Sequence, residues 1–141
     1  MREILFRGKR IDNGEWIEGY LLLCDERVFI LPWGVVGCWH FDWLKKGEYI
    51  FGKFIEVIPK TIGQYTGLTD KNGKRIFEGD IWDCQGYKGV IKWNDDDCAF
   101  EATYTVGGIE YANAVNSKRA KSAKVIGNIH DNPELLKGEN K

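Results

Sequence analysis

The stretch IGQYTGLTDKNGKRIFEGDIW, residues 62–82, decides how the C-terminal half of the chain folds. At its centre, TDKNGK places Asp70 at the first position of a turn and Gly73 at the fourth. This spacing is typical of a type I turn in which the glycine takes the left-handed conformation and closes a β-bulge. We therefore predict a β-hairpin across these residues.

Two registers are compatible with this hairpin. The type I turn with a bulge would place Leu68 opposite Ile76. A two-residue turn at the Asn-Gly pair would instead place Leu68 opposite Phe77. The first register is favoured because it also explains Asp70, whose side chain suits the first position of a type I turn.

Short apolar runs follow the hairpin at close spacing. They are GDIWDC, KGVIKWN, CAFEATYT and GIEYANA, and AKVIGNI supplies a fifth run after a gap. Turn residues occupy the gaps at Gly86, residues 94–97 and Gly107-Gly108, as in a β-meander. Five strands so closely spaced predict a small, strongly bent barrel of SH3 type, which removes sheet edges by near-closure.

The segment DNPELL, residues 131–136, predicts a short helix at the end of the fold. Asp131 or Asn132 can cap this helix, and Pro133 suits its first turn. Leu135 and Leu136 are expected to fold back onto the barrel.

The N-terminal part predicts a separate β lobe. FRGKRIDNGEWIEGYLLL is typical of a hairpin that turns at Asn13-Gly14, because both residues tolerate positive φ. ERVFILP predicts a third strand, and YIFGKFIEVI predicts one or two strands that end at Pro59. Residues 34–48 are expected to form an irregular loop with a short helical turn at residues 41–46. The chain is thus predicted to be mainly β, with a β lobe over residues 1–60 and an SH3-type barrel over residues 61–141.

IGQYTGLTDKNGKRIFEGDI together with VIGNIHDNPELL resembles the YopX-type family of small phage and prophage proteins, and FRGKRIDNGEW fits the opening of that family. The resemblance covers residues 5–18, 58–82 and 124–136. It implies a phage or prophage origin and a mostly β fold with an SH3-type roll in the C-terminal part. It implies no activity, cofactor or catalytic residue, so candidate sites must come from the residues themselves.

Composition is that of an ordinary globular protein, with 43% hydrophobic and 29% charged residues. The N-terminus MREILFRGKR lacks the apolar core of a signal peptide. The longest uncharged run, residues 28–41, is shorter than the roughly 18 apolar residues that a membrane span needs. We therefore expect a protein of the bacterial host cytoplasm, where thiols stay reduced.

Residue spacing gives little support for metal or nucleophilic chemistry. The four cysteines are Cys24, Cys38, Cys84 and Cys98. None belongs to a C-x₂₋₄-C pair of the kind found in structural zinc sites, and all are expected to pack as half-buried small hydrophobes. His40 and His130 lie far apart and no nucleophile elbow accompanies them. No catalytic residue, metal or cofactor is predicted.

The acidic run Asp95 to Asp97 is expected to be a solvated turn between two strands. Paired carboxylates can also hold Mg²⁺ and perform acid–base chemistry. A small metal-dependent hydrolase or nuclease is therefore the third function that we consider for this chain.

A basic run near the C-terminus suggests nucleic-acid binding. NSKRAKSAK, expected to be a solvated loop, contains Lys118, Arg119, Lys121 and Lys124. The aromatic residues predicted on nearby strands are Trp82, Trp93, Tyr104 and Tyr111. Together they could form a groove in which bases stack and phosphates pair with cations. Residues 61–110 carry 9 acidic and 5 basic side chains, which opposes this groove unless the charges lie on different faces.

Self-association is the function that the sequence favours. Trp33, Trp39 and Trp43 crowd an irregular segment, and tryptophans left exposed there would mark a protein–protein patch. Within the opening stretch, the predicted turn and core do not explain Gln64, Tyr65 and Thr66, which become candidate contacts between lobes or subunits. The expected protein is non-catalytic, a homo-oligomer that binds a host or phage macromolecule, with nucleic-acid binding as the alternative.

Overall fold

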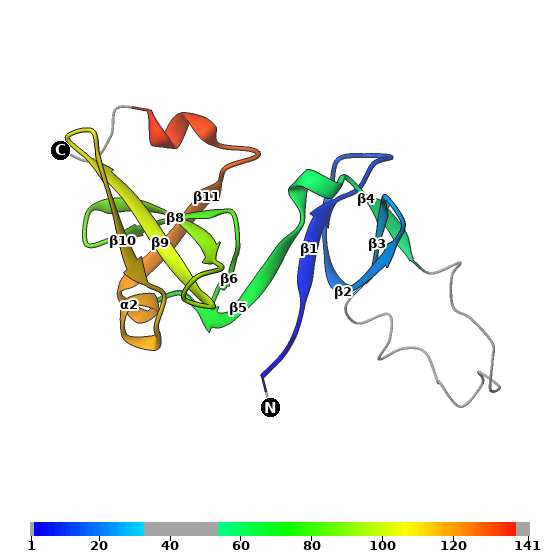
Figure 1. Cartoon of the computed structure of the whole chain (residues 1–141), viewed down its shortest axis with the longest axis horizontal. Helices are drawn as coiled ribbons and strands as arrows, with labels where there is room; N and C mark the ends of the chain where they lie inside the picture. Colours follow the sequence, from blue (N-terminus) through cyan, green and yellow to red (C-terminus); the bar gives the residue numbers. More distant parts are fainter. Residues whose placement is uncertain (1, 33–53, 138–141) are drawn as a thin grey trace. The chain divides into compact units, whose positions relative to one another are not determined.

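The computed structural model describes residues 2–32 and 54–137 (Figure 1). Strands predominate, and every pair of neighbouring strands that the structure describes is antiparallel, which confirms the predicted mainly β fold. The chain divides into two compact units, Glu3–Gln64 (unit 1) and Tyr65–Lys141 (unit 2). The predicted division into a β lobe over residues 1–60 and a barrel domain over residues 61–141 stays a prediction. The irregular loop expected at residues 34–48 lies outside the described residues.

Unit 1 is a small antiparallel sheet in the order β4-β3-β2-β1, and the first residues of β5 pair with β1. Its strands are β1 (Phe6–Lys9), β2 (Trp16–Cys24), β3 (Arg27–Pro32) and β4 (Ile55–Val57). The predicted N-terminal hairpin is confirmed, because Lys9 lies opposite Trp16 and Gly14 turns the chain at a φ of +71°. The 3₁₀ helix η3 (Pro59–Thr61) follows β4, so that strand ends before the proline, as predicted.

The hairpin of β5 (Gly63–Thr69) and β6 (Arg75–Phe77) belongs to unit 2, apart from the first two residues of β5, which belong to unit 1. The amide of Gly73 donates to the carbonyl of Asp70 over 3.0 Å, and Gly73 has a φ of +80°, as the bulged type I turn requires. Thr69 lies opposite Arg75, which belongs to the favoured register. The register then shifts before Tyr65 pairs with Phe77, because β5 carries extra residues.

The rest of unit 2 is a five-stranded sheet in the order β10-β9-β8-β7-β11. Its strands are β7 (Asp80–Cys84), β8 (Tyr87–Asn94), β9 (Ala99–Val106), β10 (Ile109–Ala114) and β11 (Ala123–Asn128). The predicted four-strand meander and its fifth strand are therefore confirmed, while closure into an SH3-type barrel stays a prediction. The core of the unit is apolar and includes Ile76, Trp82, Ile91, Ala120 and Val125.

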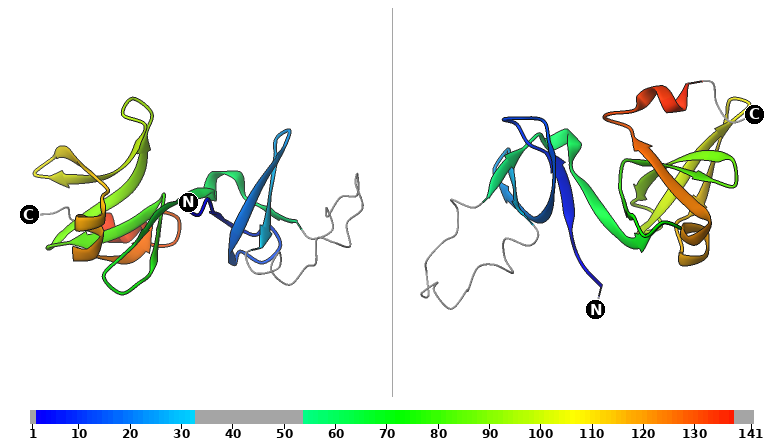
Figure 2. Two further views of the ribbon diagram at one scale, coloured as in Figure 1. Left: turned by 90° about the horizontal axis from the view of Figure 1, so that it is seen from below. Right: turned by 180° about the vertical axis from the view of Figure 1, so that it is seen from behind.

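The basic run forms a helix, α2 (Ser117–Ser122), where a loop was expected. The side chain of Asn116 accepts a hydrogen bond from the amide of Arg119 at 2.9 Å, which caps the first turn. Ala120 is buried in the core and anchors one face of the helix. The helix lies at one end of the sheet, where it links edge strand β10 with edge strand β11 (Figure 2).

The predicted C-terminal helix is confirmed as the 3₁₀ helix η4 (Pro133–Leu136). The predicted side-chain cap is wrong, because the side chain of Asn132 accepts from the amide of Asn128 at 3.2 Å instead. Leu135 packs over Gly127, as expected, whereas Leu136 is exposed.

Candidate functional site: a tyrosine and arginine pocket

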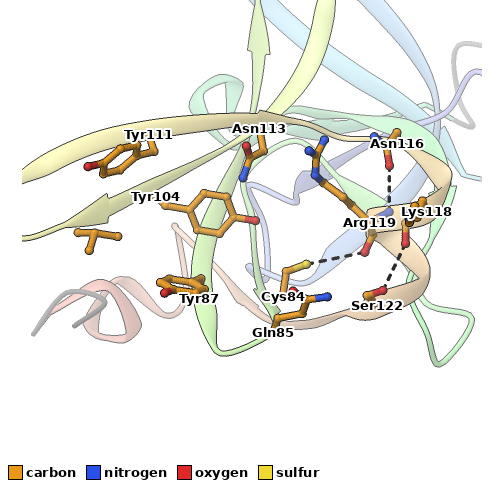
Figure 3. A pocket seen from close by; sticks show the side chains of 11 residues that line it. Cys84, Gln85, Tyr87, Tyr104, Tyr111, Asn113, Asn116, Lys118, Arg119 and Ser122 are labelled. Carbon is orange, nitrogen blue, oxygen red and sulfur yellow. Dashed lines mark hydrogen bonds between the residues drawn. The ribbon is translucent and has the colours of Figure 1, made fainter.

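Unit 2 contains a concave pocket of about 560 Å³. Strands β9 and β10 form one wall, and the β7–β8 turn together with α2 forms the other (Figure 3). The volume falls within the roughly 300–1,000 Å³ of small-ligand pockets. The side chains around the opening in Figure 3 are mainly tyrosines, amides and cations.

Strand pairing brings three tyrosines to the pocket. Tyr104 on β9 lies directly opposite Tyr111 on β10, so both side chains leave the sheet on the same face. The two-residue turn Gly107-Gly108, with φ of +58° and +80°, fixes this register. Tyr87 opens β8, and its ring meets that of Tyr104 edge-on, with 6.5 Å between the ring centroids.

Tyr104 is held rigidly against the core. Only 6% of the residue is exposed, and its hydroxyl oxygen accepts a 2.7 Å hydrogen bond from Nε1 of the buried Trp82. Burial raises the pKa of Tyr104 and outweighs the opposing effect of this hydrogen bond. The phenol therefore stays protonated, and its proton has no acceptor among the described residues, so it can be donated to a ligand in the pocket.

Helix α2 supplies the two cations of the pocket. The guanidinium of Arg119 donates through Nη1 to the carbonyl of Ala114 at 2.9 Å, which holds it near the end of β10. Lys118 is exposed, and its ammonium makes no hydrogen bond or ion pair with any residue that the structure describes. Both groups are thus available to a negatively charged ligand.

Two cations line the pocket, and the nearby carboxylate of Asp83 adds negative charge that, in addition to burial, raises the pKa of Cys84 and of Tyr104. No carboxylate is among the described residues that line it. Burial raises the pKa of the Cys84 thiol despite the opposing charge of Arg119, so the thiol is neutral at physiological pH. The amides of Gln85 and Asn113 line the pocket without a hydrogen-bond partner in the described part of the chain. The arrangement offers flat rings, hydrogen-bonding amides and positive charge to a ligand.

The structure brings together part of the predicted nucleic-acid groove. Lys118 and Arg119 share the pocket with Tyr104 and Tyr111. The other two predicted cations, on the remainder of the basic run, are exposed and do not line it; they are Lys121 and Lys124.

Two of the four predicted stacking residues are misplaced. Trp82 is wholly buried and bonded to Tyr104, so no base can reach its ring. Trp93 is 43% exposed but lies near the opposite end of β8 from Tyr87, where it packs edge-on against Phe100. Alternation along a strand predicts the face of a side chain, whereas it does not predict how deeply that face is covered.

Sequence reasoning missed Tyr87, Gln85 and Asn113. The position of Tyr87 was predictable from strand alternation and turn length. Cys84 is two residues after Trp82, so both side chains lie on one face of the sheet, and a two-residue turn places Tyr87 directly opposite Cys84. The two amides carried no such signal, since single polar residues in turns and edge strands are common.

Two of the residues left unexplained in the opening stretch, Tyr65 and Thr66, have structural roles in unit 2, whereas Gln64 belongs to unit 1. Tyr65 is buried, with its ring centroid 5.5 Å from that of Phe77. The hydroxyl of Thr66 donates to the carbonyl of Ile76 at 2.8 Å and accepts from the amide of Leu68 at 3.2 Å, which supports the register shift. Gln64 lies opposite Phe6 of β1. A contact with another subunit at residues 64–66 stays a prediction.

Asp95 to Asp97 are exposed in the turn between β8 and β9, as predicted. The side chain of Asn94 accepts from the amides of Asp96 and Asp97, so the turn has its own local hydrogen bonds. Across residues 2–32 and 54–137, no group of three or more His, Cys, Asp and Glu side chains could hold a metal ion.

The expectation for the cysteines holds for Cys84, which packs half-buried against the core, and is wrong for Cys24 and Cys98, which are exposed. Cys98 has a φ of +49° in a turn, so its position serves the turn and not the core. Cys38, His40, Trp33, Trp39 and Trp43 lie outside the described residues. None of the helices that the structure describes is long and apolar enough to cross a membrane.

A family model described as YopX protein matches residues 36–137 of this chain. No match was found among curated proteins. Among solved structures, the chain is similar to protein EF1440 from Enterococcus faecalis, with 25% sequence identity. That similarity covers 97% of this chain and 100% of the other, with a TM-score of 0.44.

Proposed function

We propose that the chain, which belongs to the YopX protein family, is a non-catalytic binding protein whose unit 2 pocket takes single-stranded nucleic acid. Family membership confirms the resemblance and is consistent with a phage-type protein. The function itself is supported by one observation: three tyrosines and two cations line one pocket, with no carboxylate among its described lining residues.

The exposed rings suit unstacked bases. Tyr87 is 47% exposed and Tyr111 is 52% exposed, so each offers part of its ring to a ligand. Stacking of a base on an aromatic side chain contributes about 1–3 kcal/mol in proteins that bind single strands. A duplex keeps its bases stacked on each other, so this source of affinity favours single strands over duplexes.

The cations suit the phosphates of such a strand. Arg119 and Lys118 border the tyrosines, and charge-assisted hydrogen bonds to phosphate are stronger than neutral ones. The acidic turn at residues 95–97 argued against this function. It follows the last residue of β8, whereas Tyr87 is the first residue of that strand. The excess of negative charge in residues 61–110 therefore includes a cluster that lies away from the pocket.

The proposal is tested by titrating the protein into a fluorescein-labelled single-stranded DNA of roughly 8 nucleotides and into RNA of the same sequence, with fluorescence anisotropy as the readout. Tyr87→Ala is expected to weaken binding about tenfold, through loss of stacking. Lys118→Gln is expected to lower the slope of log affinity against log salt by about one, because one phosphate contact is lost.

Lys121→Gln is the matched control. It removes the same charge from the same helix, but Lys121 does not line the pocket. Its salt slope should stay close to that of the wild type. The proposal is wrong if the wild-type protein shows no salt-dependent affinity, or if the two lysine variants behave alike.

Self-association is the second function that we propose, as the sequence favoured. The tryptophans that first suggested it lie outside the described residues, so its support now comes from edge strand β10, all six residues of which are exposed. A host or phage macromolecule as a further partner, a phage or prophage origin and a cytoplasmic location stay predictions.

A further inference from the structure

Strand β10 is an open edge of the unit 2 sheet. Within the described residues it pairs with β9 on one side only, and all six of its residues are exposed. Proteins protect such edges with proline, lysine, a bulge or a covering element, because an open edge is a template for strand pairing. The segment IEYANA contains no proline and no lysine, and its only charge is Glu110.

The backbone groups that face outward on this edge follow from the turn. The two-residue turn makes Val106 and Ile109 a hydrogen-bonded pair, and such pairs alternate along an antiparallel ladder. Tyr111 therefore directs its amide and carbonyl toward β9, whereas Glu110 and Ala112 direct theirs away from the sheet. Neither residue has a hydrogen bond to another described residue through these outward groups.

We infer that β10 pairs in antiparallel fashion with β10 of a second copy of the chain, with Glu110 opposite Ala112 of that copy. An antiparallel edge is self-complementary under twofold symmetry, because each copy offers the same two amides and two carbonyls to the other. In this register the only charge of the strand faces an alanine, so the contact contains no like-charge pair.

This pairing places the two pockets on one face of a joined sheet. Tyr111 lies at the twofold axis opposite Tyr111 of the second copy, and both rings are on the pocket face. The side chains of Glu110 and Ala112 leave the opposite face, because neighbouring residues in a strand alternate. Changes at these two positions therefore probe the contact without altering the lining of the pocket.

The test is the dimer dissociation constant, measured by sedimentation equilibrium at low salt. Ala112→Lys places a lysine opposite Glu110 of the second copy at two symmetric positions and is expected to tighten the dimer roughly fivefold. Ala112→Glu places like charges there and is expected to weaken it by a similar factor. Both effects should shrink at high salt, because the pairs are exposed.

The double variant Glu110→Gln/Ala112→Lys is the control for the register. It keeps the new lysine and removes its partner charge, so the gain of Ala112→Lys should disappear. The inference is overturned if the wild type is a monomer at concentrations up to about 100 μM, or if the lysine and glutamate variants dissociate with equal constants.

The outcome can be separated from that of the proposed function. A monomer that binds the single-stranded oligonucleotide overturns the pairing and leaves the pocket assignment standing. A dimer that responds to charge at position 112 without binding nucleic acid supports the pairing and overturns the pocket assignment.

Discussion

The polar side chain of Asp70 at the β5–β6 turn is hydrogen-bonded within the fold, whereas several polar side chains in the pocket are not, although both regions lie in unit 2. At the turn, Asp70 is 5% exposed and both of its carboxylate oxygens accept hydrogen bonds within the fold. One oxygen accepts from the amides of Asn72 and Lys74 at 2.8 and 2.9 Å, and the other accepts from the amide of Val125 at 2.9 Å. Asp70 thereby ties the hairpin to strand β11, 55 residues further along the chain.

In the pocket, polar groups are left without protein partners. The amides of Gln85 and Asn113 have none in the described part of the chain, and the proton of Tyr104 has no acceptor there. An acidic side chain that satisfies three backbone amides has little capacity left for a ligand. The comparison therefore indicates that the most distinctive stretch of the sequence is structural, and it supports the proposal that ligands bind at the pocket.

Removal of the hydrogen bonds of Asp70 should have the largest effect on stability. Asp70→Ala removes three charge-assisted hydrogen bonds and leaves the buried amide of Val125 without an acceptor, so we expect unit 2 to lose about 3 kcal/mol of unfolding free energy. Urea denaturation followed by circular dichroism measures this loss. Hydrogen exchange at the amide of Val125 should speed up, because that amide is bonded to Asp70.

Asn113→Ala is the matched change in the pocket. Its amide is exposed and has no partner among the described residues, so the expected change in stability is within about 0.5 kcal/mol. Equal losses for the two variants would contradict the comparison, since they would show that the pocket amide also supports the fold.

Local signals account for what could be predicted. The hairpin at Asp70 and Gly73 was predictable in type and register because turn chemistry acts over four residues. The meander was predictable because apolar runs and turn residues alternate at short spacing. The link from Asp70 to Val125 was not, because it joins residues that no local pattern connects.

Part of the pocket was also predictable, because some of its residues belong to local sequence patterns. The basic run and two of the tyrosines could be named from the sequence, and strand pairing brought them together. Helix α2 was missed because its six residues give a weak local signal, and its support comes from burial of Ala120 in the core. The depth of Trp82 was missed because burial depends on the whole sheet.

The second prediction concerns the close contact of Gly89 with Tyr104, where the core meets the pocket. Gly89 lies against Tyr104 and Trp82, and an added Cβ would stand 2.6 Å from Cε1 of Tyr104. Gly89→Ala should therefore displace the tyrosine and cost about 2 kcal/mol through overpacking. Thermal or urea unfolding gives the cost, and the oligonucleotide titration shows whether displacement of Tyr104 also weakens binding.

Gly86→Ala separates packing from backbone strain. Gly86 has a φ of +89° in open space, so the expected cost is only that of a left-handed alanine, about 1 kcal/mol. A larger loss for Gly86→Ala than for Gly89→Ala would mean that the packing between Tyr104 and β8 is looser than the distances indicate.

The third and smallest expected effect is on the pH dependence of the unfolding free energy, through the carboxylate of Asp70. Burial alone would raise the pKa of Asp70, but hydrogen bonds from the amides of Val125, Lys74 and Asn72 outweigh it and hold the pKa below its ordinary value of 3.8. The unfolded chain therefore binds a proton more readily than the folded chain does. The stabilisation from this group is complete above pH 3.8 and is lost as the pH falls from there through the folded pKa.

Asp70→Asn isolates this contribution, because the amide does not titrate and cannot reproduce all three acceptor contacts. Urea denaturation at a series of pH values should show the wild type more stable by a constant margin near neutral pH. That margin should narrow as the pH falls below 3.8, because protonation of Asp70 in the wild type removes the same negative charge. Asp96→Asn, in the exposed β8–β9 turn, controls for the loss of one carboxylate. A margin that stays constant down to the acid transition would show that the three amide contacts do not favour the charged form of Asp70, and the contrast with the pocket would then rest on burial alone.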